Sequence, residues 1–315
     1  MTTFNHSQGV HDWVPTRDGR HLYAQVLAGP EPPTVVFESG SGATRSYWAQ
    51  AQQGVATFAR AVVYDRAGLG HSEPDPAGRT LDRMADDLLD VLDHFGPGPF
   101  VLVGHSAGGP IVRLAASRRP GMVAGLVLVD PTDEDADVLF APPFRIGERV
   151  SIAVGKVLAR LGLLRRLFAG QLAAMPDEDA REDLRHEGFG YNVLETQQRQ
   201  ARTFLDELKK WRKRPPDLGS IPVTVISGGR LRVDGMPEHI RVRINLAHSY
   251  RAAQSPRGRH VVAQRSGHNI PLSEPEVIVR EVAALCRSTR PAQPPPPTSQ
   301  DTPPPSSVSR NQPGG

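Results

Sequence analysis

The chain has 315 residues, of which 38% are hydrophobic, and a formal net charge of +3. A chain of this length forms about two domains, or one large α/β domain with an insertion. The charge is too small to indicate a dedicated nucleic-acid-binding protein. The single cysteine, Cys286, excludes an intramolecular disulfide and a thiolate metal cluster.

The two ends of the sequence indicate where the protein is found and which segment is disordered. The N-terminus lacks a charged segment followed by an apolar run, and no stretch of about 18 apolar residues occurs, so we expect a cytoplasmic protein. Residues 290–315 are rich in proline and poor in aliphatic side chains, and we expect them to form a disordered tail. The run PPPP at 294–297 is alternatively a polyproline ligand.

Short strand patterns alternate with helical patterns along the chain. Asp18-Gly19 predicts the turn of a hairpin within residues 11–27. A helix is expected near residues 79–96, because apolar residues recur there at helical spacing and Gly96 follows them. This alternation is typical of βαβ units and predicts a mostly parallel central sheet flanked by helices. The apolar runs that we interpret as buried strands are residues 34–39, 60–65, 100–104, 124–130, 222–228 and 259–264.

The strand patterns are interrupted by one long helical segment. Residues 131–220 have helical periodicity, and we interpret them as a helical cap inserted into a core formed by residues 1–130 and 221–289. A last helix, EPEVIVREVAALC, closes the core and places Cys286 on its apolar face, where a small buried residue is expected. Ligands of an open parallel sheet bind beyond the carboxyl ends of the strands. The cap is expected to lie over that edge.

The stretch VLVGHSAGG, residues 101–109, runs from a predicted strand into a predicted helix. Glycine packs poorly and loses much backbone entropy on ordering, so glycines around a polar residue do not serve stability. Gly104 to Gly108 have the form G-x-S-x-G. Between a strand and a helix, this pattern predicts a sharp turn that exposes the Ser106 hydroxyl. We therefore predict that Ser106 is a nucleophile.

A serine nucleophile needs a base and donors for the oxyanion that forms. His268, in the loop RSGHNIPLSEP after the last predicted strand, is the predicted base. His105 also follows a strand end, but we expect it to point differently on the turn. The predicted oxyanion donors are the N–H of Ala107, directly after the nucleophile, and the N–H of Ser41 in the loop FESGSGAT.

Five segments resemble the α/β-hydrolase superfamily and occur in the order expected for it: ESGSGATRSYW, YDRAGLGHSEP, VGHSAGG, LVLVDP and SGHNIPLSEPEVI. The resemblance covers about residues 10–289 and implies the α/β-hydrolase fold, with no metal and no organic cofactor. The serine at the turn disfavours relatives with an aspartate nucleophile, such as dehalogenases and epoxide hydrolases. The oxyanion loop of the family usually begins His-Gly, and this chain has Ser39-Gly40 instead. The loop is therefore expected to be supported differently.

The acid that orients the base has two candidates. The family usually places it a few residues after the strand at 222–228, where the first carboxylate is Asp234. Some members place it after the strand that follows the nucleophile helix, the position of Asp130. We favour Asp130, because an acid must be held rigidly against the imidazole and a strand end holds it better than a long loop. Asp234 is the alternative.

The favoured function is a serine hydrolase that cleaves an ester or thioester of a small or medium apolar acyl substrate through an acyl-enzyme intermediate. One alternative is a non-catalytic ligand-binding protein of the same fold. Another is a membrane-surface lipid hydrolase, because the basic and apolar run Arg149–Phe168 has the character of a surface helix. We favour a cap that lines an acyl pocket. The apolar face of that helix would hold Leu158, Leu161, Leu164 and Phe168.

Overall fold

The computed structural model describes residues 6–30, 32–233 and 235–289. Its centre is an eight-stranded sheet in the order β1-β2-β4-β3-β5-β6-β7-β8. The pairs β1–β2 and β2–β4 are antiparallel, and the pairs from β4 across to β8 are parallel, which confirms the predicted mostly parallel sheet. The strands are β1 (Val10–Pro15), β2 (His21–Leu27), β3 (Thr34–Glu38), β4 (Ala61–Tyr64), β5 (Phe100–His105), β6 (Val123–Val129), β7 (Val223–Gly228) and β8 (Gly258–Ala263).

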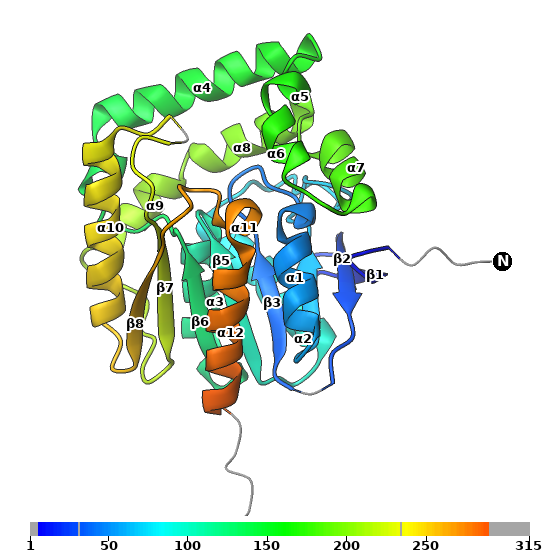
Figure 1. Cartoon of the computed structure of the whole chain (residues 1–315), viewed down its shortest axis with the longest axis vertical. Helices are drawn as coiled ribbons and strands as arrows, with labels where there is room; N and C mark the ends of the chain where they lie inside the picture. The colour runs from blue at the N-terminus through cyan, green and yellow to red at the C-terminus, as the bar shows by residue number, and fades with distance from the viewer. Residues whose placement is uncertain (1–5, 31, 234, 290–315) are drawn as a thin grey trace, which may run out of the picture.

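Helices cover both faces of this sheet (Figure 1). α1 and α12 pack against each other on one face, and α2, α3 and α10 pack on the other. The predicted helix near 79–96 is α2, which ends at Phe95, directly before Gly96. The helices of the core are η1 (Arg45–Trp48), α1 (Ala49–Ala56), α2 (Leu81–Phe95), α3 (Gly108–Arg118), η2 (Pro120–Met122), α10 (Glu238–Ala253), α11 (Ile270–Ser273) and α12 (Pro275–Thr289).

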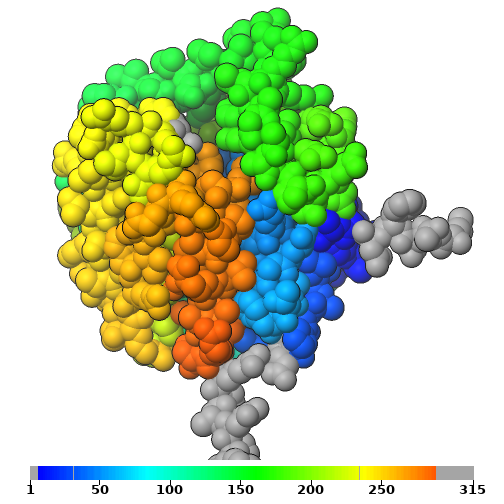
Figure 2. Space-filling model, in the orientation of Figure 1, coloured from blue at the N-terminus to red at the C-terminus, as the bar shows by residue number. Residues whose placement is uncertain are grey.

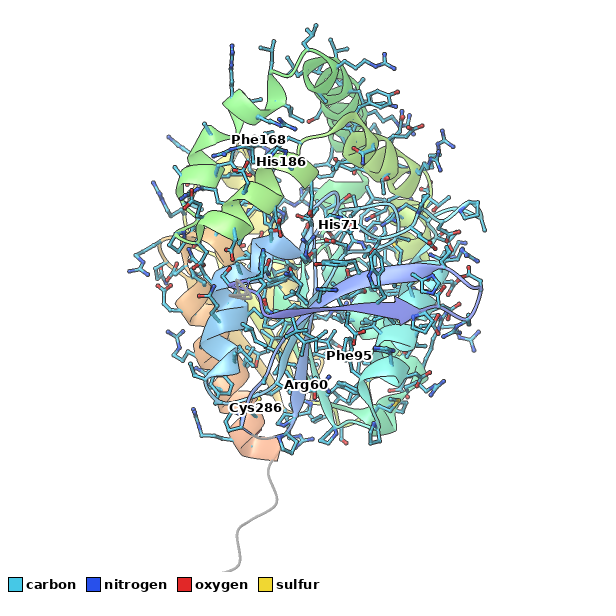
Figure 3. The ribbon with its side chains drawn as sticks, turned by 90° about the vertical axis from the view of Figure 1, so that its right-hand side faces the viewer. Arg60, His71, Phe95, Phe168, His186 and Cys286 are labelled. Carbon is cyan, nitrogen blue, oxygen red and sulfur yellow. The ribbon has the colours of Figure 1, made fainter. Side chains whose placement is uncertain are left out.

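Alternating side chains of the central strands fill the two layers of the core. Phe100 and Leu102 of β5 belong to one cluster, and Val101 and Val103 belong to the other, as the two-residue period of a strand requires. Cys286 of α12 is buried in the second cluster, in the position expected for a small core residue. Figure 3 shows it near the end of the molecule away from the inserted helices.

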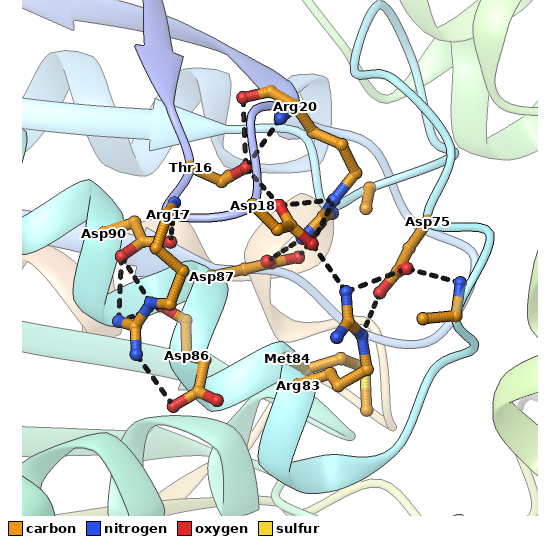
Figure 4. Close-up of polar contacts among 12 residues, drawn as sticks. Thr16, Arg17, Asp18, Arg20, Asp75, Arg83, Met84, Asp86, Asp87 and Asp90 are labelled. Atoms are coloured by element: carbon orange, nitrogen blue, oxygen red, sulfur yellow. Dashed lines mark hydrogen bonds and ion pairs between the residues drawn. The ribbon is translucent and has the colours of Figure 1, made fainter.

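Ion pairs fasten the N-terminal hairpin to α2 (Figure 4). The hairpin turns at Asp18-Gly19 between β1 and β2, as predicted. Arg20 donates to Asp18 at 3.0 Å and to Asp87 of α2 at 2.6 Å. Arg83 of α2 donates back to Asp18 at 2.7 Å. These contacts anchor the antiparallel edge of the sheet.

Between β6 and β7 the described chain forms helices and no strand, and Figure 1 places these helices together at one end of the sheet. They are η3 (Asp137–Phe140), α4 (Pro142–Arg160), α5 (Leu164–Leu167), α6 (Ala169–Ala173), α7 (Glu178–Glu187), α8 (Tyr191–Ala201) and α9 (Phe204–Lys210). No helix within the described ranges combines the length and the apolar character needed to cross a bilayer. The predicted disordered tail, residues 290–315, lies outside the described residues.

The expectation that Leu158, Leu161, Leu164 and Phe168 share one apolar face is wrong for Leu161. α4 ends at Arg160, and Gly162 adopts a φ of 69° in the turn that precedes α5. Leu161, at the end of α4, is 65% exposed, whereas Leu164, after the turn, is 5% exposed. Phe168 stacks on Phe189, with ring centroids 5.5 Å apart.

Candidate active site

Ser106 lies at a sharp turn between β5 and α3. Its φ of 52° is in the left-handed region, which a residue with a side chain rarely adopts and which costs backbone strain. Two hydrogen bonds hold the turn: the Ser106 N–H donates to the Val129 carbonyl at 3.0 Å, and the Thr132 N–H donates to the Ser106 carbonyl at 2.9 Å. The strained residue is thereby fixed at the carboxyl end of β5.

The glycines around Ser106 are required by close backbone approach. A Cβ on Gly104 would lie 2.6 Å from the Gly108 carbonyl oxygen, and a Cβ on Gly108 would lie 2.4 Å from the Glu38 carbonyl oxygen. Both distances are too short for a side chain. The G-x-S-x-G pattern thus packs strand, turn and helix tightly enough to fix the serine.

His268 and Asp130 complete a hydrogen-bonded series with Ser106. The loop between β8 and α11 carries His268, whose Nε2 lies 3.1 Å from Ser106 Oγ. Its Nδ1 lies 2.6 Å from Asp130 Oδ2. Because an ionised carboxylate only accepts hydrogen bonds, Nδ1 carries the proton and Nε2 is left to accept from the serine hydroxyl. The structure therefore brings together three residues that the sequence analysis selected.

Asp130 directly follows β6 and is 3% exposed. Its Oδ1 accepts from the Gly228 N–H at 3.0 Å, and Arg241 Nη1 donates to its two oxygens at 2.7 and 2.8 Å. Burial by itself raises the pKa of Asp130, but the contact with His268 and the charge of Arg241 outweigh burial and hold this pKa well below its usual range. The carboxylate is thus ionised. The alternative acid, Asp234, lies outside the described residues.

The loop after β3 approaches the nucleophile closely. A Cβ on Gly40 would lie 3.3 Å from Ser106 Cβ. Trp48 Nε1 donates to Ser39 Oγ at 3.0 Å, and Arg66 donates to the carbonyls of Ser39 and Gly40. These contacts support the loop from Ser39-Gly40, where the family usually has His-Gly.

The two predicted oxyanion donors border the same cavity as Ser106 and His268. This cavity has a volume of about 320 Å³. In the described part of the chain, neither the Ser41 nor the Ala107 N–H donates to a backbone carbonyl. The other residues that line the cavity are Thr132, Leu139, Phe144, Glu148, Gln197, Gln200, Ala201, Phe204 and Leu205.

Comparison with known proteins identifies the family of this chain. A family model described as "Alpha/beta hydrolase family" matches residues 35–281. The chain belongs to the alpha/beta hydrolase family. This alpha/beta hydrolase is 25% identical over 281 residues to the uncharacterized protein YqjL of Bacillus subtilis, covering 88% of this chain and 94% of YqjL. It is 34% identical over 113 residues to the putative carbamate hydrolase RutD of Rhizobium rhizogenes. That match covers 35% of this chain and 42% of RutD, less than half of the relative's length.

Solved structures are similar in fold over most of this alpha/beta hydrolase. The epoxide hydrolase CorEH is 18% identical, with a TM-score of 0.69 and coverage of 89% of this chain and 99% of CorEH. A thermophilic esterase from Thermogutta terrifontis is 20% identical, with a TM-score of 0.64 and the same coverage of 89% and 99%. At these identities the likeness concerns the fold alone.

Three polar residues of the cavity in this alpha/beta hydrolase escaped the sequence analysis. Glu148 comes from α4, and Gln197 and Gln200 come from α8. Burial raises the pKa of Glu148, although the charges of Arg145 and Arg149 oppose this rise. No motif marks these residues, because their position depends on how the inserted helices pack over the strand ends.

A second cavity of about 330 Å³ lies under the inserted helices of this alpha/beta hydrolase. Ser41 and Gln197 line both cavities, so the second adjoins the first. Figure 3 labels Phe168, one of the aromatic residues of its wall. Its wall combines polar side chains, among them Tyr47 and Gln171, with aliphatic and aromatic ones, which are Val154, Leu158, Leu164, Leu167, Phe168, Phe189, Val193 and Leu194.

An acidic cluster beyond Asp130 is neutralised by arginines. Asp133, Glu134 and Asp135 place carboxylate oxygens within 4.8 Å of one another. Arg113 donates to Glu134 at 2.7 Å, and Arg251 donates to Asp133 and to Asp135, each at 2.8 Å. Through these ion pairs the cluster links α3 and α10 to the loop after β6.

Proposed function

We propose that this alpha/beta hydrolase is a serine hydrolase that cleaves an ester or thioester of a small or medium apolar acyl group. The observation that carries the proposal is the series Ser106, His268 and Asp130, with separations of 3.1 and 2.6 Å, at the edge of a cavity that Ser41 and Ala107 also line. A merely structural serine needs neither strained backbone nor an oriented imidazole.

In the first half of the reaction, Ser106 Oγ attacks the acyl carbon and its proton moves to His268 Nε2. The carbonyl oxygen becomes an oxyanion, which the N–H groups of Ser41 and Ala107 stabilise. When the carbon–oxygen or carbon–sulfur bond breaks, Nε2 returns the proton to the leaving alcohol or thiol. The acyl group is then bonded to Ser106.

In the second half, water replaces the leaving group. Nε2 takes a proton from the water as its oxygen attacks the acyl carbon, and it gives that proton to Ser106 Oγ when the ester bond to the serine breaks. The products are a carboxylic acid and the free enzyme. Asp130 keeps the imidazole oriented through both halves and stabilises its cationic form.

The cavities support the choice of acyl group. The catalytic cavity of about 320 Å³ is walled in part by Phe144, Phe204 and Leu205. The adjoining cavity of about 330 Å³, whose wall includes Leu158, Leu164 and Phe168, extends the space available to a longer chain. The relative RutD is named as a putative carbamate hydrolase. A serine can attack the carbonyl carbon of a carbamate in the same way, so a carbamate belongs among the test substrates.

The test is turnover of p-nitrophenyl esters of graded acyl length, together with a p-nitrophenyl carbamate. We expect hydrolysis of short and medium esters, and a loss on the order of 10⁴-fold or more in Ser106→Ala. Ser117→Ala is the matched control, because Ser117 lies on α3 and donates to the Leu114 carbonyl outside the cavity. Equal activity in Ser106→Ala and the native protein would refute the proposal.

A further inference from the structure

The longest helix of the inserted segment, α4, has an apolar stripe on its outer face. Five aliphatic side chains recur at intervals of three or four residues, which places them within about 80° around a helix of 3.6 residues per turn. Each of them is more than half exposed. They are Ile146 (58%), Val150 (55%), Val154 (52%), Val157 (56%) and Leu161 (65%).

Apart from Val154, which also borders the cavity under the inserted helices, the stripe lies away from the face that packs on the protein. The opposite side of α4 buries Ile152 and Gly155. A helix at the surface of a soluble protein normally presents polar residues to water, and a contiguous exposed apolar patch marks an interaction surface. Figure 2 shows α4 along the upper edge of the molecule.

Positive charge accompanies the stripe. Residues 142–174 contain six basic residues and one acidic residue, Glu148, which faces the catalytic cavity. Arg145 is paired with Asp206 at 2.6 Å. The other arginines have no carboxylate partner within ion-pair distance in the described ranges, and all of them are exposed. They are Arg149 and Arg160 on α4, and Arg165 and Arg166 on α5.

The charge decides between the possible occupants of the stripe. A second copy of the chain would bring the same arginines together, and like charges oppose that contact. An anionic lipid surface complements both features, because its acyl region takes up aliphatic side chains and its headgroups attract arginines. We infer that α4 docks this protein on an anionic membrane surface, with the stripe from Ile146 to Leu161 entering the headgroup region.

The test is co-sedimentation with lipid vesicles, which requires no turnover and is therefore independent of the proposed hydrolysis. One set contains phosphatidylcholine alone, and the other contains equal parts of phosphatidylcholine and phosphatidylglycerol. We expect binding to the mixed vesicles, with little binding to phosphatidylcholine alone and a decline as salt is added. The catalytically impaired Ser106→Ala variant should bind as the native protein does.

Two substitutions locate the docking face. Leu161→Asp should lower the ratio of bound to free protein by about 10-fold or more, because it places a charge within the apolar stripe. Leu246→Asp on α10 is the matched control, since Leu246 is also 65% exposed, and it should leave binding unchanged. Thermal melting and hydrolysis of a soluble ester check that both variants are folded.

Three results would overturn the inference. The first is equal binding to the two kinds of vesicle, or to neither. The second is vesicle binding that is unchanged both in Leu161→Asp and in Val157→Asp. The third is a dimer in sedimentation equilibrium that Leu161→Asp dissociates while vesicles bind no protein, because the stripe would then be an interface between copies of the chain.

Discussion

Replacing Asp130 by Asn retains the shape of the side chain but exchanges one carboxylate oxygen for an NH₂ group. The hydrogen bonds of the site determine how the amide is oriented. The Gly228 N–H donates to Oδ1 at 3.0 Å, so the amide oxygen is held at the Oδ1 position. The NH₂ group then takes the Oδ2 position, 2.6 Å from His268 Nδ1. As a donor, it requires that Nδ1 carry no proton.

The consequence is the wrong tautomer of His268. The imidazole proton moves to Nε2, which lies 3.1 Å from Ser106 Oγ and can no longer accept the serine proton. The expected loss in turnover is up to about 10⁴-fold. At about 1.36 kcal/mol for each factor of ten, this corresponds to about 5.4 kcal/mol in activation free energy. The fold should survive, because Gly228 and Arg241 both still donate to the oxygen at the Oδ1 position, although Arg241 loses its second acceptor.

The assay is kcat/KM for a p-nitrophenyl ester, with thermal melting as the check on folding. Asp234→Asn is the comparison, because Asp234 is the other candidate acid, and its effect should be mild. If Asp234→Asn cripples turnover while Asp130→Asn retains most of it, the reasoning from the Asp130 contacts is wrong.

Three further predictions concern stability and the tail. Burial lowers the pKa of His105 from 6.5 to about 3, so the unfolded chain binds a proton that the native state does not. The free energy of unfolding should therefore fall as the pH drops from about 6.5 to about 3, by up to about 1.4 kcal/mol per pH unit. Denaturant titrations at several pH values measure this fall, which should be smaller in His105→Gln. Gly108→Ala should destabilise the folded protein by about 1–3 kcal/mol, because the added Cβ would meet the Glu38 carbonyl. Gly121→Ala is the control, since its Cβ enters open space. Equal melting temperatures of the two variants would contradict the close approach at Gly108. Truncation after Thr289 should leave melting and turnover unchanged, since the proline-rich tail has few side chains able to dock, and a clear loss of either would show that it packs on the domain.

Features encoded in short stretches of the sequence were predictable. The apolar run at 100–104 and the glycines around Ser106 are neighbours in the chain, so strand, turn and helix could be derived together. The hairpin at Asp18-Gly19 and the end of α2 before Gly96 are local in the same sense. Each depends on backbone conformations that a few residues determine.

Features that depend on packing between distant segments were not predictable in the same way. Arg241 contacts Asp130 from 111 positions further along the chain, and only the fold shows that contact. Glu148 faces the catalytic cavity because of how α4 lies over the strand ends. Leu161 was assigned to the wrong face, because α4 ends and the chain turns at Gly162, whereas Leu158 and Leu164 do line the adjoining cavity.

The central claim is that Ser106 is an activated nucleophile, and covalent labelling tests it most directly. A fluorophosphonate reacts quickly only with a serine whose proton is accepted by a base and whose adduct is held by oxyanion donors. Peptide mass spectrometry of the labelled protein should place the adduct on Ser106 alone, and His268→Ala should abolish the rapid labelling. An adduct on another serine, or no adduct on the folded native protein, would contradict the account.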